Sequence, residues 1–174
     1  MSFVRFGLIL AAGLLAACNP LQEATLDNGL KIVVREDHRA PVVVSQIWYK
    51  VGASDEPDGL TGISHVLEHM MFKGTRTHKN GEFSRIIAEN GGRENAFTGA
   101  DYTAYFQQLE KSRLAIAFEL EADRMRNLVL DDQEVAKEIR VVMEERRLRT
   151  DDQPEALAYE RFMATAFTTH SYKN

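Results

Sequence analysis

Residues 93–109, RENAFTGADYTAYFQQL, have the composition of two β-strands joined by a turn. Both halves contain Thr, Tyr or Phe, which are enriched in strands, and Gly99-Ala100-Asp101 supplies the turn residues between them. Just before this stretch, Phe83 to Asn90 have a helical pattern that ends at Gly91-Gly92. The segment therefore predicts a pair of adjacent strands preceded by a short helix.

The pattern changes on either side of this central segment. After Lys111 it is helical, and we expect one helix over about 112–128, a second over about 132–149 and a third after Pro154. Further upstream the sequence predicts a hairpin at 21–35 turning at Asn28-Gly29, a strand after Pro41 and a helix from an N-cap at Thr61 to about Met71. The strand VVVSQIWYKV is almost continuously apolar, which favours a central place in a sheet.

This order of elements predicts one α+β unit with a mixed, mainly antiparallel sheet packed against helices. Three strands followed by three helices would ordinarily be completed by another strand. We therefore expect the domain to be truncated at its C-terminus and the chain to be part of a longer protein.

Composition excludes some classes of function. The 174 residues carry a formal net charge of -5 and no long basic run, so nucleic acid is not an expected partner. Cys18 is the single cysteine, so neither an internal disulfide nor a zinc cluster of thiolates can form within the chain.

The first residues have the pattern of an export signal. An apolar run from Phe6 to Ala17 follows a short start that contains Arg5, and it is too short to span a membrane. Leu15-Ala16-Ala17-Cys18 resembles the lipobox of bacterial lipoproteins, which implies cleavage of residues 1–17 and a lipid on Cys18. The alternative is an ordinary signal peptide. On the lipobox interpretation we expect a periplasmic, membrane-anchored lipoprotein of a Gram-negative bacterium, with residues 18–174 as the folded domain.

Residues 64–75, SHVLEHMMFKGT, carry the strongest functional signal. His65 and His69 are four residues apart and so lie on one helix face, where two imidazoles can bind one zinc ion with a third ligand from elsewhere. Glu68 lies beside them and can take a proton from a zinc-activated water. The alternative is a chance group of surface residues. Because the neighbouring residues are apolar, we expect this helix to be largely buried, which favours a metal partner for the polar group.

The resemblance of this region to a known family is specific. GLTGISHVLEHMMFKGT contains the inverted His-x-x-Glu-His motif and resembles the pitrilysin/insulinase (M16) family of zinc metallopeptidases, in particular the bacterial relatives of the mitochondrial processing peptidase. GGRENAFTGADYTAYF is similar to a strand segment of that family, and EIRVVMEERR to the helix that carries its third zinc ligand. The resemblance extends from the LDNGLKIVVRED hairpin to the HSYKN end.

The resemblance implies a set of site residues. It implies one Zn²⁺ per chain bound by His65, His69 and Glu145, with Glu68 as catalytic base. Glu145 lies 76 residues beyond His69 and seven beyond Glu138, as in the family, whereas its neighbour Glu144 would point about 100° around the helix. Glu138 corresponds to an acid that orients the site; without the family, a solvated helix acid is the simpler interpretation. The strand residues that would bind substrate are Asn95, Ala96, Phe97 and Thr98, although an ordinary strand with a buried Phe97 is the alternative.

The resemblance also implies function and partners. We expect a zinc metalloendopeptidase that hydrolyses extended peptides or unfolded proteins between two homologous halves, the second half lying in the same polypeptide or in a separate subunit. The isolated 174 residues are expected to cleave peptides poorly. The alternatives are a non-catalytic peptide-binding or scaffold subunit of the same family, and an unrelated lipid-anchored binding module.

Overall fold

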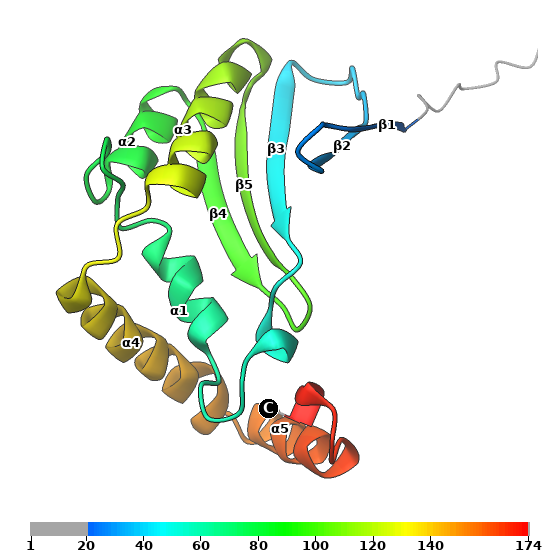
Figure 1. Cartoon of the computed structure of the whole chain (residues 1–174), viewed down its shortest axis with the longest axis vertical. Helices are drawn as coiled ribbons and strands as arrows, with labels where there is room; N and C mark the ends of the chain where they lie inside the picture. Colours follow the sequence, from blue (N-terminus) through cyan, green and yellow to red (C-terminus); the bar gives the residue numbers. More distant parts are fainter. Residues whose placement is uncertain (1–20, 174) are drawn as a thin grey trace, which may run out of the picture. The chain divides into compact units, whose positions relative to one another are not determined.

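The computed structural model describes residues 21–173, which form two compact units divided after Ala40 (Figure 1). Each unit is considered by itself. Residues 1–17 and Cys18, which carry the predicted signal and lipid site, lie outside the described residues. Among the helices that are described, none has the length and apolar character needed to cross a membrane.

The first unit contains an antiparallel hairpin of β1 (Gln22–Thr25) and β2 (Lys31–Val34). At its turn Gly29 has a φ of 86°, a conformation that glycine adopts without steric cost. The Asn28 side chain accepts a hydrogen bond of 3.1 Å from the backbone N–H of Leu30. The predicted hairpin and its Asn-Gly turn are confirmed.

The second unit is built on a three-stranded antiparallel sheet. Its strands are β3 (Val42–Tyr49), β4 (Arg93–Thr98) and β5 (Thr103–Glu110), in the order β3-β5-β4. The two predicted strands within 93–109 are therefore paired neighbours, and the α+β fold class is confirmed. The predicted central place of the Val42 strand is wrong, because β5 is central and β3 pairs with β5 alone among the described strands.

The error about β3 has a simple physical origin. Alternate side chains of β3 face away from the helices, and Trp48 on that outer face is 52% exposed. A strand made almost entirely of apolar residues is buried on both faces only if other elements cover both faces of the sheet. Here Trp48 instead contacts Phe97 and Tyr102, with ring centroids 5.6 and 5.1 Å away, so aromatic side chains shield one another on the open face.

Five α-helices complete the second unit, close to the predicted positions. They are α1 (Ile63–Met70), α2 (Glu82–Glu89), α3 (Leu114–Asn127), α4 (Asp132–Arg146) and α5 (Pro154–Ala166). The second of the predicted C-terminal helices ends earlier than expected, because a π-helical turn, Arg147–Asp151, follows α4. Short 3-10 turns lie at Ala53–Asp55 (η1), Lys111–Arg113 (η2) and Ser171–Lys173 (η4).

The apolar core lies between the sheet and the helices α2 and α3. Phe83 and Ile87 of α2 pack with Leu109 of β5 and with two buried residues of α3, Ala117 and Leu120. Helix α2 must end close to the sheet, and Gly92 permits this approach. A Cβ on that residue would lie 2.1 Å from a methyl carbon of Leu109.

A buried arginine beside this core was not predicted. Arg124 of α3 is 1% exposed and forms an ion pair with Glu121. Its guanidinium lies 5.2, 4.6 and 4.3 Å from the ring centroids of Phe72, Phe83 and Tyr105. The aromatic faces and the carboxylate compensate for part of the cost of burying the charge, while Nε and Nη1 have no hydrogen-bond partner among the described residues. Through Phe72 the guanidinium also links α3 to the segment after α1.

Candidate metal centre

The helix that carries the two histidines starts at a different residue from the one predicted. Thr61 is not the N-cap; Gly62 is, with a φ of 94°. The cap is supplied by the carboxylate of the buried Glu56, which accepts hydrogen bonds from the backbone N–H groups of Gly62 (2.6 Å) and Ser64 (2.7 Å). A negative charge on these free N–H groups stabilises the first turn of the helix. Glu56 therefore anchors α1 immediately before His65.

Helices α1 and α4 lie side by side and bring the three predicted zinc ligands together (Figure 1). Glu145 Oε2 is 3.4 Å from His65 Nε2 and 3.6 Å from His69 Nε2. One ligand atom from each of the three residues lies within 4.8 Å of the others. Within residues 21–173 this is the one group of three such side chains close enough to share an ion.

The geometry of this group fits a zinc ion. Two imidazole nitrogens and a carboxylate oxygen form a ligand set typical of catalytic zinc sites. Ligand atoms about 2.0–2.1 Å from a tetrahedral zinc are separated by roughly 3.3 Å. Two of the three separations here, 3.4 and 3.6 Å, are close to that value, and all three are within 4.8 Å. All three side chains are partly buried, so an ion would retain an open side for water or substrate.

Glu144 and Glu145 have separate positions, as the helical spacing predicts. The Glu144 carboxylate pairs with Arg147 at 2.5 Å and its side chain is 55% exposed. Glu145 is 23% exposed and has its second oxygen 2.7 Å from Arg149. Glu145 therefore faces α1 and the histidines, whereas Glu144 faces solvent.

Glu68 lies on the buried face of α1, the helix that carries both histidines. It is 9% exposed, and one carboxylate oxygen accepts a hydrogen bond of 2.5 Å from the hydroxyl of Thr98 on β4. The expectation that α1 is largely buried is correct for this face alone, because Ile63 is 50% and Leu67 44% exposed. The apolar neighbours of the motif therefore do not bury the whole helix.

Glu138 contacts the cluster through His69. Its side chain is 7% exposed, with Oε2 3.1 Å from His69 Nδ1 and Oε1 2.7 Å from Lys73 Nζ. Burial alone would raise the pKa of Glu138, but the hydrogen bonds from Lys73 and His69 outweigh it and hold that pKa below its ordinary value. The charged carboxylate is therefore the stable form next to the imidazole.

The four predicted substrate-binding residues lie on β4, which pairs with β5 along one side in the described sheet. Ala96 and Thr98 point toward the helices, and Thr98 reaches Glu68. Asn95 and Phe97 are exposed on the opposite face, where the Asn95 side chain accepts a hydrogen bond from the N–H of Ala96. The alternative of an ordinary strand with a buried Phe97 does not hold, because Phe97 is 40% exposed.

A hydrogen-bonded cluster anchors the loop that follows α1. The carboxylate of Asp123 on α3 accepts hydrogen bonds from the hydroxyls of Thr75 and Thr77 and from the Asn127 amide, and it pairs with His78 at 2.9 Å. His78 lies in this loop, and its side chain is 24% exposed. Although burial would raise the pKa of Asp123, these hydrogen bonds hold it well below its usual range.

This low pKa makes the stability of the protein depend on pH. A depressed carboxyl pKa contributes stability above the unfolded pKa of about 3.9, and that contribution is lost as pH falls through the folded pKa. We therefore expect Asp123→Asn to lower the free energy of unfolding by about 1–3 kcal/mol at pH 6 and to flatten its fall below about pH 4. Chemical denaturation across pH 3–6 measures both effects, with the exposed Asp152→Asn as control. Equal pH profiles for wild type and Asp123→Asn would contradict this.

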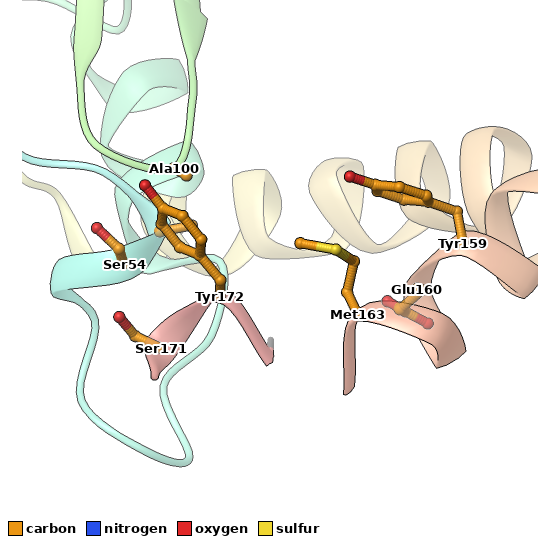
Figure 2. A pocket seen from close by; sticks show the side chains of 8 residues that line it. Ser54, Ala100, Tyr159, Glu160, Met163, Ser171 and Tyr172 are labelled. Carbon is orange, nitrogen blue, oxygen red and sulfur yellow. The ribbon is translucent and has the colours of Figure 1, made fainter. Parts of the chain in front are cut away.

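A pocket of about 430 Å³ lies away from these residues, between the β4–β5 turn, η1, α5 and η4. Figure 2 shows Tyr159 and Met163 of α5 on one side and Ser54 and Tyr172 on the other. The Tyr172 hydroxyl donates to Asp101 at 2.5 Å. None of the lining residues belongs to the metal cluster.

Comparison with known proteins agrees with the fold and identifies the family. The sequence profile of the family described as insulinase (peptidase family M16) matches residues 31–174, and the chain belongs to this family. The chain is 41% identical over 152 residues to the zinc protease PqqE of Helicobacter pylori, covering 87% of this chain and 34% of that protein. It is also 31% identical over 151 residues to the uncharacterized zinc protease YmxG of Bacillus subtilis, covering 87% and 37%.

A solved structure has the same fold. The crystal structure of a protease from Helicobacter pylori superposes with a TM-score of 0.86 at 39% identity, over 90% of this chain and 38% of that one. The chain thus spans about a third of the length of the curated relatives it matches.

Proposed function

We propose that this protein is a zinc-dependent metalloendopeptidase that hydrolyses extended peptides or unfolded proteins. The observation that carries the proposal is the convergence of His65, His69 and Glu145, with Glu68 on the same helix as the two histidines. Family membership and the relatives named zinc proteases support the same class of reaction.

Different residues of the chain would bind the metal, transfer the proton and orient a ligand. His65, His69 and Glu145 would hold one zinc ion, which, when bound, would polarise the scissile carbonyl and acidify a water molecule. Glu68 takes a proton from the attacking water as the new C–O bond forms. When the C–N bond breaks, Glu68 returns that proton to the leaving amine nitrogen. Glu138 would hold the proton of His69 on Nδ1, which would leave the lone pair of Nε2, the nitrogen nearer Glu145, for the metal.

Strand β4 offers a binding mode for the substrate. Its free side in the described sheet can add an extended peptide through backbone hydrogen bonds, which requires an unfolded segment and gives weak sequence preference. Thr98 at the end of β4 contacts Glu68, so a peptide on this strand would pass close to the proposed base. A second homologous half would close over that peptide.

The proposal also includes a location. The apolar leader and the lipobox at Cys18 support a reaction outside the cytoplasm, on a lipid-anchored protein.

Metal content and metal-dependent cleavage test this function directly. We expect about one zinc per purified chain, and cleavage of an unfolded protein that stops with a chelator and returns with added zinc. The full-length protein, including any second half, is the material for the cleavage assay. Zinc binding without cleavage by the full-length protein would support the scaffold alternative, and a folded protein without zinc affinity would contradict the metal centre.

A further inference from the structure

We propose that Lys73 is a positioning residue of the metal centre, which holds Glu138 in the orientation that presents His69 to the metal. The inference rests on the proposed zinc function and assigns a residue that the His-x-x-Glu-His motif does not contain. It is carried by the chain of contacts from Lys73 through Glu138 to His69.

The backbone after α1 places Lys73 near the ligand face. Lys73 follows His69 by four residues, so the two would share a face if the helix continued. The helical path tightens here: the N–H of Phe72 bonds to the His69 carbonyl (3.1 Å), and the N–H of Lys73 bonds to the Met70 carbonyl (3.0 Å). These bonds keep Lys73 next to α4, where Glu138 lies.

The two oxygens of Glu138 have separate partners. Oε1 lies 2.7 Å from Lys73 Nζ and Oε2 lies 3.1 Å from His69 Nδ1. Glu138 is 7% and Lys73 25% exposed on their side chains, so water competes weakly for this pair. With one oxygen held by the ammonium group, rotation of the carboxylate is restricted and the other oxygen stays directed at the imidazole.

The orientation of His69 depends on that second oxygen. A carboxylate at Nδ1 favours the tautomer with the proton on Nδ1, which leaves the Nε2 lone pair for a metal. His69 Nε2 is the atom 3.6 Å from Glu145 Oε2. Without Lys73 the buried Oε1 loses its charged partner, and the carboxylate can turn away from the histidine to find another donor.

Glu145 likewise has one oxygen on a basic side chain and the other toward the histidines, but this ion pair is more exposed to solvent. Arg149 contacts Glu145 Oε1 at 2.7 Å, and the other oxygen faces the histidines. Arg149 is 75% exposed, and an exposed pair contributes little. The more buried Lys73–Glu138 pair is therefore the one we expect to control the metal site.

The test is the zinc affinity of Lys73→Met, measured by competition with a chromogenic chelator. Losing the direct partner of a metal ligand usually costs about 10–100-fold in affinity, and we expect a loss of this order because Lys73→Met frees Glu138, the partner of His69. Lys73→Arg, which retains a charged donor, should recover most of the affinity. The matched control is Lys137→Met, one residue from Glu138 on α4, where the lysine pairs with Glu134 and is 56% exposed. This control should change affinity less than about threefold.

A double-mutant cycle separates positioning from a general loss of stability. If Lys73 acts through Glu138, adding Lys73→Met to Glu138→Gln should lower the affinity no further. In the Co²⁺-substituted protein, Lys73→Met and Glu138→Gln should alter the visible absorption bands alike. Additive losses, or wild-type affinity in Lys73→Met, would overturn the inference. Failure of the wild-type protein to bind zinc would instead contradict the proposed metal centre.

Discussion

Replacing Glu68 with glutamine is expected to abolish peptide cleavage while the protein still binds zinc. Glutamine has nearly the same shape and can still contact the Thr98 hydroxyl, but it cannot take a proton from water. Because general acid–base catalysis contributes about 10²–10⁴-fold to a rate, we expect the turnover number to fall by that factor or more. Cleavage of a quenched fluorescent peptide by the full-length protein, together with zinc content, measures both properties.

The control for Glu68→Gln is the same substitution on a neighbouring helix. Glu89 of α2 pairs with Arg85 on the surface, and its side chain is 57% exposed. Glu89→Gln should leave both zinc content and turnover near wild type. Substantial turnover by Glu68→Gln would exclude Glu68 as the base, whereas loss of zinc in that variant would mean that the carboxylate stabilises the metal site itself.

Replacing Glu145 with glutamine is expected to remove most of the zinc affinity. The substitution deletes the anionic ligand that brings α4 to both histidines, at 3.4 and 3.6 Å. The remaining pair of imidazoles on α1 is a poor zinc site, because structural and catalytic sites use at least three protein ligands. We expect a loss greater than the roughly 10–100-fold that follows loss of an outer partner. Competition titration with a chromogenic chelator measures the change.

Glu144 provides a matched control one residue away. Glu144→Gln removes the same charge from the same helix but affects a carboxylate that pairs with Arg147 at the surface. Its zinc affinity should stay within about threefold of wild type, since an exposed ion pair has little energetic weight. If the two variants bound zinc equally well, the assignment of Glu145 as third ligand would be wrong.

Local pattern is enough to predict much of this fold. The Asn28-Gly29 turn, the end of α2 at the two glycines and the strands within 93–109 all follow from residues close together in sequence. Helical periodicity likewise places His65 beside His69, and Glu138 on the same side of α4 as Glu145. The choice of Glu145 as the third ligand came from family resemblance, and the distances to the histidines agree with it.

Other features depend on contacts between distant segments, and the sequence pattern did not reveal them. The exposed face of β3 could not be predicted, because an apolar strand has the same composition whether one face or both are covered. The cap of α1 by Glu56 and the burial of Arg124 among aromatic rings depend on neighbours that only the folded chain supplies. The Thr98–Glu68 contact joins residues thirty positions apart.

By itself, the sequence determined most of the elements and the pairing of His65 with His69 on one helix face, because turns, strand composition and helical spacing are local properties of the chain. Only the tertiary structure decided which carboxylate oxygens face the histidines and that Lys73 pairs with Glu138. Those relations require α1 and α4 to pack together, and packing is set by the summed contacts of the whole domain rather than by any one segment.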